Sequence, residues 1–444
     1  MGRAQVVQAQ ASGVAPEVIM NPVLLKPGTD TSSQIIVLGR PVGDLDAATG
    51  WHRKHELLDV VLEAHRELQR RFDVVICEGA GSPAEINLRS TDIVNLGFAR
   101  AANVPALLVG DIDRGGVFAS LVGTMAVLES ADQDMIRGFI INKFRGSKEL
   151  LASGLDRLHE LTGRPTLGVV PLLRGLELDA EDATDFTSWA DGPAPLGADT
   201  LTIGVVALPR ASNLTDVDPL IDEPGVVVRP LYRPEQMQDC DLVVLPGTRA
   251  TVSDMQWLRS RGFEEALQQR ANSGRPIFGI CGGYQMLGTT IDDDVEGKIG
   301  RIAGFALLPV RTVFQREKVV RRTTQQLATG AVISGYQIHH GTVSVDGGEE
   351  LLAGEGCVQG AVAGTTWHGL FENDEWRRTF LTMIARQTGR HFVATTTTSF
   401  ADRRETRIDA IADLIEEHLD THALNALLES STRASLANLV LRAQ

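Results

Sequence analysis

Apolar and polar residues follow two spacings along the chain, and together these spacings predict an α/β fold. Short apolar runs predict buried strands, and longer segments with an apolar stripe at helical spacing predict helices. The predicted strands are Ser33–Leu38, Phe72–Cys77, Val104–Val109, Arg137–Ile141, Leu167–Val170, Leu201–Val206, Gly225–Arg229, Asp241–Leu245, Pro276–Ile280 and Ala361–Thr366. The predicted helices cover residues 1–12, 52–71, 148–161 and 254–272, a segment that ends at residue 386, and a segment around residues 408–419. Because strands and helices alternate, we expect parallel, doubly wound sheets.

The length of the chain and one polar stretch predict two domains. A chain of 444 residues is too long for a single hydrophobic core. Residues 186–200 are rich in Asp, Gly, Pro and Ala and show no periodicity, which is typical of a linker. We therefore expect a first domain over residues 1–185 and a second over 201–392, with a strand-rich insertion at 302–366. Residues 393–444 should form a C-terminal helical tail that packs on the second domain.

Composition narrows the class of protein. The chain has 42 basic and 57 acidic residues, a net charge of −15, which argues against nucleic acid as a partner. No stretch of about twenty apolar residues predicts a membrane span. Four cysteines without a pairing pattern indicate a reducing compartment, and no apolar signal region precedes the first helix. We expect a cytoplasmic protein with no membrane partner, and the sequence leaves its oligomeric state open.

The strongest chemical signal is a cysteine between a strand and a helix. The segment Gly279–Gly283 places Cys281 in a Gly-x-nucleophile-Gly-Gly turn, the pattern of a nucleophile elbow with Cys in place of Ser. The helix that follows favours the thiolate, which is the form that attacks carbonyl carbons. Cys281 is therefore the candidate nucleophile. The other three cysteines, Cys77, Cys240 and Cys357, lack such flanks and are expected to be small buried hydrophobes.

A nucleophilic cysteine needs a base and donors for an oxyanion. His368 is the candidate base, because it follows a predicted strand just as Cys281 does. The expected oxyanion donors are the backbone N–H groups at Gly247 and Gly282. A third group that orients His368 is not evident. Glu372 is one candidate, and a plain role at a helix N-terminus is as good an interpretation of it.

Three further residues are candidates for binding. His339, two residues before Gly341, is predicted to contact substrate or to be structural. Glu78 follows a predicted strand and precedes a glycine-rich turn, where α/β folds bind ligands, and a turn-stabilising role is the alternative. Lys26 lies between apolar residues and a proline, and the sequence leaves a solvated lysine and an anion-binding lysine equally open.

Long motifs in both halves resemble one family. The second half carries Leu245–Thr248, Gly279–Gly288, Tyr336–Gly341 and Trp367–Glu372, which resemble a glutamine amidotransferase domain. The first half carries Gly2–Gln5, Met20–Pro27, Glu78–Leu88, Gly110–Ala119 and Asn142–Gly146. Together these motifs are similar to the cobyric acid synthase family. The resemblance implies a dethiobiotin-synthetase-like P-loop NTPase domain followed by a class I glutamine amidotransferase-like α/β domain.

The resemblance also implies a reaction and its site residues. Such enzymes use ATP, Mg²⁺ and glutamine to amidate the peripheral b, d, e and g carboxylates of a corrinoid, adenosylcobyrinic acid a,c-diamide. Cys281 would form a γ-glutamyl thioester and release ammonia. Glu78 would help to hold Mg²⁺, and Asn142 would contact the adenine. The alternatives are a cobyrinic acid a,c-diamide synthase, and a chain that only hydrolyses glutamine or binds a corrinoid.

One departure from the family pattern concerns the ATP-binding loop. The chain contains no G-x-x-x-x-G-K-[ST] sequence. The expectation from this departure is that the chain begins inside the first domain, after that domain's first strand and helix, and that it lacks ATP-dependent amidation on its own.

Overall fold

The computed structural model describes residues 2–27, 32–46, 54–173, 176, 193–397, 399–429, 436 and 438–439. The chain forms two compact units. The first comprises Met1–Leu178 together with Glu405–Gln444, and the second comprises Asp179–Arg404. Most of the expected linker, residues 186–192, lies outside the described residues. No described helix is long and apolar enough to cross a membrane.

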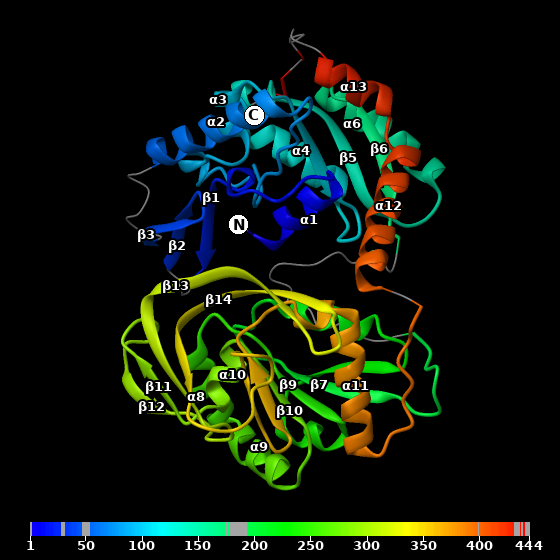
Figure 1. The fold of residues 1–444 in the computed structure, drawn as a ribbon. Coiled ribbons are helices and arrows are strands. Elements are labelled where there is room, and N and C mark those ends of the chain that lie inside the picture. The colour runs from blue at the N-terminus through cyan, green and yellow to red at the C-terminus, as the bar shows by residue number, and fades with distance from the viewer. Residues whose placement is uncertain are drawn as a thin grey trace. The chain divides into compact units, whose positions relative to one another are not determined.

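The second unit is built on a six-stranded sheet with the strand order β15-β16-β10-β9-β7-β8 (Figure 1). The strands are β7 (Leu201–Val206), β8 (Val226–Leu231), β9 (Leu242–Leu245), β10 (Ile277–Ile280), β15 (Cys357–Gln359) and β16 (Val362–Thr365). All neighbours pair in parallel except β15, which is antiparallel to β16. The predicted doubly wound α/β arrangement is therefore confirmed for this unit.

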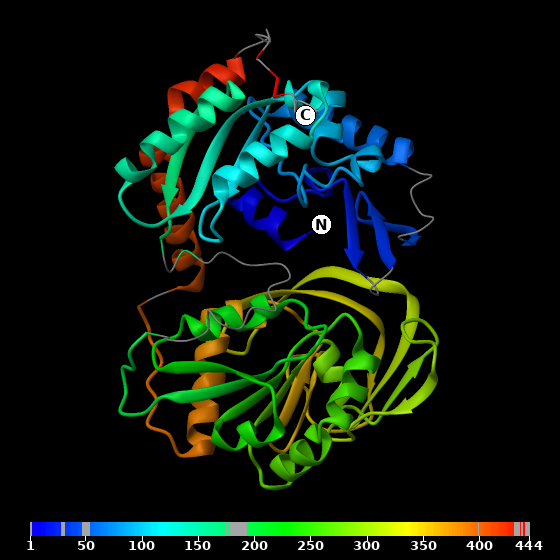
Figure 2. The same cartoon turned by 180° about the vertical axis from the view of Figure 1, so that it is seen from behind.

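Helices cover both faces of this sheet because its strands are apolar on both sides. In β9, Leu242 and Val244 join the core on one face, and Val243 and Leu245 join the core on the other. The helices of this unit are α7 (Asp218–Ile221), α8 (Thr251–Ser260), α9 (Phe263–Asn272), α10 (Gly282–Leu287) and α11 (Asp374–Thr388). Figures 1 and 2 show α11 on one side of the sheet and α8 to α10 on the other.

An aromatic cluster lies beneath the end of the central strand. Phe278 of β10 packs against Phe371, Trp376 and Phe380, with ring centroids 5.1 to 6.2 Å apart. Phe371 belongs to the short helix η8 (Leu370–Glu372), which follows β16. Such aromatic contacts contribute about 0.5–1.5 kcal/mol each beyond the buried area. The cluster therefore holds the segment after β16 firmly against β10.

A smaller sheet fills the region where a β insertion is expected. Its strand order is β12-β11-β13-β14. The strands are β11 (Thr290–Asp293), β12 (Gly300–Ala303), β13 (Val310–Gln326) and β14 (Val332–Val345). β13 and β14 form a long antiparallel hairpin whose register shifts between Val313 and Lys318. An isolated bridge pairs Tyr336 of β14 with His368, so the hairpin reaches the carboxyl end of the main sheet.

The first unit contains two three-stranded sheets (Figure 2). β4 (Ala106–Asp111), β5 (Ile136–Phe144) and β6 (Thr166–Pro171) are parallel, and β1 (Val23–Pro27), β2 (Ser32–Val37) and β3 (Arg40–Asp46) are antiparallel. The main helices are α1 (Arg3–Ala11), α2 (Lys54–Arg71), α3 (Leu96–Ala102), α4 (Val117–Val127), α5 (Ser130–Gln133) and α6 (Ala152–Thr162).

One predicted strand of this unit is wrong. Phe72–Cys77 runs without regular structure, and Val74 and Ile76 are exposed. A strand is stable only when a neighbouring strand satisfies its backbone groups, and no described strand pairs with this segment. The apolar run therefore predicted a buried strand where the structure has an irregular segment with exposed side chains.

The C-terminal helices also differ from expectation. They are α12 (Phe400–His418) and α13 (Thr421–Glu429), and the chain from Glu405 onward belongs to the first unit. Leu419 forms a bridge with Gly168, and the Asp420 N–H donates to the carbonyl oxygen of Leu167 at 2.7 Å. β6 is an edge strand, and its unpaired backbone groups accept these contacts. The tail thus packs on the first unit, where we had expected the second.

Candidate active site

Cys281 occupies the sharp turn between β10 and α10. Its backbone has φ 50° and ψ −107°, a strained conformation for a residue with a side chain. The flanking glycines are required by close approach: a Cβ atom on Gly283 would lie 2.1 Å from the carbonyl oxygen of Leu245. A Cβ atom on Gly279 would lie 2.6 Å from the Cα atom of Tyr284. The structure therefore places Cys281 in an elbow of the kind that the sequence predicts.

His368 lies beside Cys281 because their strands are neighbours in the sheet. β10 and β16 pair in parallel, and the Cys281 N–H donates to the carbonyl oxygen of Thr365 at 2.8 Å. The His368 side chain is fully buried, and Cys281 acts on it electrostatically. Parallel strands end at the same edge of the sheet, which explains why two strand-end residues 87 positions apart (368 − 281) meet.

Asp216 completes a chain of three side chains. Its Oδ2 atom lies 2.7 Å from Nδ1 of His368, and its Oδ1 atom accepts the Gly369 N–H at 2.7 Å. Nδ1 is thereby engaged, and Nε2 is the ring nitrogen that remains for the thiol. Asp216 belongs to the short helix η6 (Leu214–Val217), which follows β7. The arrangement has the geometry of a nucleophile, a base and a carboxylate that orients the base.

The environment of His368 favours its charged form. Burial disfavours the imidazolium, but Asp216 and Cys281 outweigh burial and raise the pKa of His368 to about 10. The interactions with Asp216 and Cys281 in a buried site explain this direction. At neutral pH the ring therefore carries two protons, and one of them is available on Nε2.

Glu372, the sequence-based candidate for the third group, has a different contact. Its Oε2 atom lies 3.3 Å from a guanidinium nitrogen of Arg404. Little in the sequence singles out Asp216, which lies 152 residues before His368. The one available signal was the position of Asp216 in the sequence, after the predicted strand Leu201–Val206. Residues that follow parallel strands lie together at the carboxyl ends of the sheet.

A stacked ring and an amide hold His368 from the other side. Tyr336 stacks on His368 with ring centroids 5.2 Å apart. Asn213 lies close to both rings: its Nδ2 atom is 3.4 Å from Nε2 of His368, and the Tyr336 hydroxyl donates to its Oδ1 atom at 3.4 Å. These contacts restrict the imidazole to the orientation that faces Cys281.

The two glycines predicted to supply oxyanion donors lie at the site. A Cβ atom on Gly247 would be 3.0 Å from Cε1 of His368 and 3.8 Å from Cβ of Cys281. A Cβ atom on Gly282 would be 2.7 Å from Cγ2 of Thr248. Both backbones therefore approach the site closely, and only glycine fits at either position without displacing a neighbour.

Glu296 is a buried carboxylate near this turn that the sequence did not single out. Its Oε1 atom accepts the Thr251 N–H at 3.0 Å, and its Oε2 atom has no hydrogen-bond partner among the described residues. Thr251 is a neighbour of the turn, since a Cβ atom on Gly282 would lie 3.2 Å from its Oγ1 atom. Burial raises the pKa of Glu296 to about 7. A nearby cation would stabilise its charged form.

His339 is buried beside the same site. It follows Ile338, whose carbonyl oxygen lies 3.9 Å from Sγ of Cys281. Only 8% of His339 is exposed, and neither ring nitrogen has a hydrogen-bond partner in the described part of the chain. Burial lowers the pKa of His339, so the ring is neutral at neutral pH.

The candidate residues of the first unit lie in more open surroundings. Glu78 is exposed, and its Oε2 atom accepts a hydrogen bond from Nε2 of Gln8 at 2.6 Å. Asn142 is half-buried in β5, opposite Asp111, and its Oδ1 atom accepts the Lys143 N–H. Lys26 lies in β1, and the description does not extend to its side chain. Within the described ranges, no group of three or more His, Cys, Asp or Glu residues has the geometry of a metal site.

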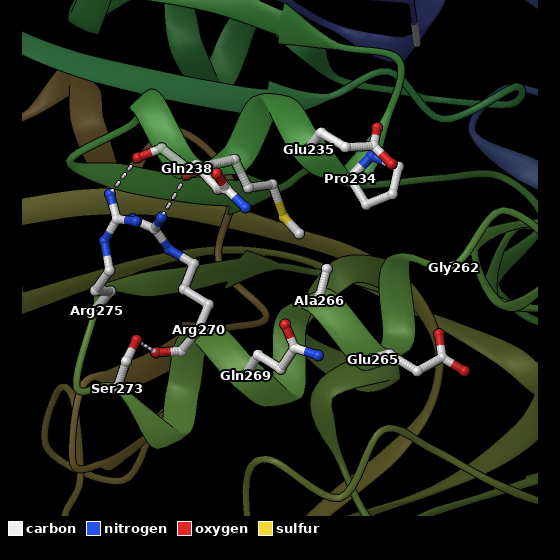
Figure 3. A pocket seen from close by; sticks show the side chains of 11 residues that line it. Pro234, Glu235, Gln238, Gly262, Glu265, Ala266, Gln269, Arg270, Ser273 and Arg275 are labelled. Carbon is white, nitrogen blue, oxygen red and sulfur yellow. Dashed lines mark hydrogen bonds between the residues drawn. The ribbon is translucent and has the colours of Figure 1, made fainter.

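A pocket of about 340 Å³ lies at the amino ends of the strands of the main sheet, between η7 (Pro234–Asp239) and α9 (Figure 3). Arg270 and Arg275 point into the gap between these helices. Arg270 donates to the carbonyl oxygens of Pro276, Met237, Cys240 and Asp241, and Arg275 donates to those of Gln238 and Cys240. Because these carbonyl oxygens accept hydrogen bonds from both guanidinium groups, the two arginines link η7 to the amino ends of the strands.

Known proteins match both halves of the chain. Residues 7–184 match the CobQ/CobB/MinD/ParA nucleotide binding domain, and residues 202–376 match the CobB/CobQ-like glutamine amidotransferase domain. A protein of Streptomyces avermitilis named cobyric acid synthase is 53% identical over 443 residues, which are 98% of this chain and 88% of that protein. Proteins with the same name from Streptomyces coelicolor and Frankia casuarinae are 52% and 50% identical, with the same two shares. The resemblance drawn from the motifs is confirmed.

Proposed function

The chain belongs to the cobyric acid synthase family, and we propose that it amidates the b, d, e and g carboxylates of adenosylcobyrinic acid a,c-diamide. The family assignment supplies the reaction class, a glutamine-dependent amidation in cobalamin biosynthesis. The nucleotide-binding match implies that ATP is used. The identity of the corrinoid and of its four carboxylates goes beyond the family assignment and is the part that we propose.

The arrangement of Cys281, His368 and Asp216, in which Asp216 is hydrogen-bonded to His368, carries the proposed chemistry of the second unit. The thiolate of Cys281 attacks the carboxamide carbon of glutamine, and the resulting oxyanion accepts hydrogen bonds from the backbone at Gly247 and Gly282. The C–N bond breaks as Nε2 of His368 gives its proton to the leaving nitrogen, which departs as ammonia. A γ-glutamyl thioester remains, and water, deprotonated by His368, releases glutamate and restores the thiolate.

Glu296 is the proposed partner of the α-ammonium group of glutamine. Beside Thr251 and close to Gly282, it presents one carboxylate oxygen without a hydrogen-bond partner in the described part of the chain. A bound ammonium would pair with that oxygen and hold the carboxylate in its charged form. Glu296→Gln should raise the KM for glutamine about tenfold and change kcat little. An unchanged KM would contradict this role.

In the first unit we propose that ATP activates a corrinoid carboxylate as an acyl phosphate, which ammonia then displaces. Asn142 is the proposed adenine contact, and Glu78 the proposed ligand of Mg²⁺. Mg²⁺ is usually bound by one or two carboxylates together with substrate phosphates, so the single exposed carboxylate of Glu78 fits such a site. When bound, the ion would neutralise phosphate charge.

The test follows the nitrogen atom. The chain is supplied with amide-¹⁵N glutamine, ATP, Mg²⁺ and adenosylcobyrinic acid a,c-diamide, and the corrinoid product is weighed by mass spectrometry. We expect up to four ¹⁵N amides per corrinoid. Amidation of cobyrinic acid at its a and c positions would instead indicate a diamide synthase. Glutamate release without any corrinoid product would reduce the proposal to a glutaminase and would bear out the expectation, drawn from the absent G-x-x-x-x-G-K-[ST] sequence, that this chain lacks ATP-dependent amidation on its own.

A further inference from the structure

Asp254 is a fully buried carboxylate whose hydrogen bonds reach outside its own helix. It lies in the first turn of α8, and its side chain is not exposed. Its Oδ2 atom accepts the Thr248 hydroxyl at 2.5 Å and the Arg210 N–H at 3.3 Å. The helix dipole alone explains many carboxylates at helix N-termini, but these two donors belong to loops outside α8. Because burial of a carboxylate is costly, the two contacts require an explanation of their own.

The two donors lie in loops that carry groups of the active site. Thr248 directly follows Gly247, a proposed oxyanion donor, in the loop after β9. Arg210 lies in the loop after β7, which continues to Asp216 in η6. Asp254 therefore links the loop of an oxyanion donor to the loop of the residue that orients the base.

The two loops also contact each other through a short antiparallel ladder. The Ser212 N–H donates to the carbonyl oxygen of Gly247 at 2.9 Å, and the Arg249 N–H donates to that of Arg210 at 3.1 Å. The Thr248 hydroxyl lies 3.0 Å from the same Arg210 oxygen. Glycine adopts many backbone conformations, so without these bonds Gly247 would turn its N–H away from the thiol at little cost. The ladder and the Thr248 hydroxyl together fix the backbone at Gly247 and at the two residues after it.

The contacts of Asp254 depend on hydrogen bonding more than on charge. Its second oxygen, Oδ1, has no hydrogen-bond partner among the described residues. Nη1 of Arg210 lies 3.7 Å from that oxygen, which is beyond hydrogen-bond distance, and the Arg210 side chain is exposed to solvent that screens its charge. Burial raises the pKa of Asp254. A neutral side chain of the same shape should therefore make the same contacts with Thr248 and Arg210.

We propose that Asp254 is a positioning residue for the oxyanion site, which holds the Gly247 N–H toward the reacting carbonyl through the Thr248 hydroxyl and the Arg210 N–H. This inference rests on the proposed glutaminase reaction. Asp254 acts only through these two neighbours, so its removal should leave glutamine binding intact. Its effect should appear in the steps that form the oxyanion, and therefore in kcat.

The experiment compares variants of Asp254 with the wild-type chain in glutamine hydrolysis. Asp254→Ala should lower kcat about tenfold to a hundredfold and leave KM within about twofold. Asp254→Asn, whose amide oxygen takes the place of Oδ2, should keep kcat within about threefold of the wild type. Thr248→Val should lower kcat as well, and its combination with Asp254→Ala should add little, because the two side chains act as one unit. Glu264→Ala, in the first turn of α9, is the matched control and should leave kcat within about twofold.

A second measurement separates the oxyanion site from the nucleophile. Alkylation of Cys281 by iodoacetamide forms no oxyanion, so its rate in Asp254→Ala should stay within about twofold of the wild-type rate. Mass spectrometry of the peptide that contains Cys281 measures this rate apart from the other cysteines. A general loosening of the fold would instead change the alkylation rate and the melting temperature together.

Three results would overturn the inference. They are an unchanged kcat in Asp254→Ala, a kcat of Asp254→Asn as low as that of Asp254→Ala, and losses that multiply in the double variant. If Asp254→Ala does not fold, Thr248→Val against Thr248→Ser gives the same comparison, and equal kcat values in that pair would overturn the inference. A wild-type chain that releases no glutamate would instead overturn the proposed glutaminase itself.

Discussion

The two units place polar residues at the ends of parallel strands in similar ways, yet only one of them encloses those residues. In the second unit, Cys281 and His368 are buried, and Asp216 fixes the orientation of His368. In the first unit, Asn142 near the end of β5 is half-buried, and Glu78, which follows a segment without regular structure, is exposed. The difference comes from the β13–β14 hairpin, whose residue Tyr336 stacks on His368. The end of a strand sets the position of a catalytic group. The residues that cover that group, here those of the β13–β14 hairpin, exclude water from it and so determine its reactivity.

The largest effect on glutamine hydrolysis is expected from a substitution that removes the nucleophile of the second unit and leaves the first unit unchanged. Cys281→Ala should lower glutamine hydrolysis by about a thousandfold or more, because no other nucleophile replaces the thiolate. Ammonium should support ATP-dependent amidation in the variant to the same extent as in the wild type, because the two sites belong to different units. The measurements are glutamate release, corrinoid amidation with ammonium, and a melting curve, which should move by no more than about 3 °C. Unchanged glutaminase activity in this variant would remove Cys281 from the mechanism.

The next effect separates the two histidine roles. His368→Asn should lower glutaminase turnover by about a hundredfold or more, the scale of a lost general acid–base. His340→Asn, on the neighbouring strand, should cost less than about threefold. Steady-state glutaminase assays at saturating glutamine measure both. Equal losses in the two variants would mean that burial beside Cys281 does not identify the base.

A smaller effect tests the carboxylate that orients the base. Asp216→Asn should lower glutaminase turnover about tenfold to a hundredfold, because the ring loses its orienting partner. The pKa of His368, which is about 10 with Asp216 in place, should fall toward its ordinary value. Glutaminase activity should then decline at a lower pH in the variant than in the wild type. Glu372→Gln is the control, and a loss as large as that of Asp216→Asn would reverse the two assignments.

The same pair predicts a pH-dependent stability. The folded-state pKa of His368 is raised, so its charged pair with Asp216 stabilises the fold fully below about pH 6.5 and ceases to do so as the pH rises through about 10. Urea unfolding of the wild type and of Asp216→Asn should therefore differ most near pH 6 and least near pH 10. A gap that widens as the pH rises would contradict the sign of the shift.

The smallest effect on glutamine hydrolysis is expected from the first unit. Asn142→Ala should leave glutaminase activity within about twofold, because Asn142 belongs to another core. If it contacts the adenine, the KM for ATP in ammonium-dependent amidation should rise about tenfold or less. An unchanged KM for ATP would withdraw the role that the family resemblance implies for this residue.

The sequence predicted the parts of the fold that local pattern controls. The apolar runs at Leu201–Val206 and Asp241–Leu245 correspond to β7 and β9, and the glycines beside Cys281 marked the elbow. What it missed depends on distant partners. Phe72–Cys77 has the pattern of a strand, and none of the described strands lies beside it. Asp216 is one acidic residue among several, and only its hydrogen bond to His368 sets it apart.

The C-terminal helices show the same limit. A one-sided apolar stripe predicts that a helix packs on something, and it does not say on what. The helix around residues 408–419 packs on the first unit, because the edge strand β6 forms backbone contacts with Leu419 and Asp420. The final assignment of a terminal helix depends on which open edge it reaches, and periodicity carries no information about that.

The separation of Asp216 from His368 has a consequence for synthesis of the chain. Their hydrogen bond closes a loop of 152 residues, with Cys281 and the whole β13–β14 hairpin between them. A nascent chain therefore exposes the nucleophile before its base exists, and the bond that tunes the base forms only when β16 joins β10. Until then the cysteine is an ordinary thiol with an ordinary reactivity. The ability to release ammonia thus appears with the completed sheet, and no earlier fragment of the chain holds it.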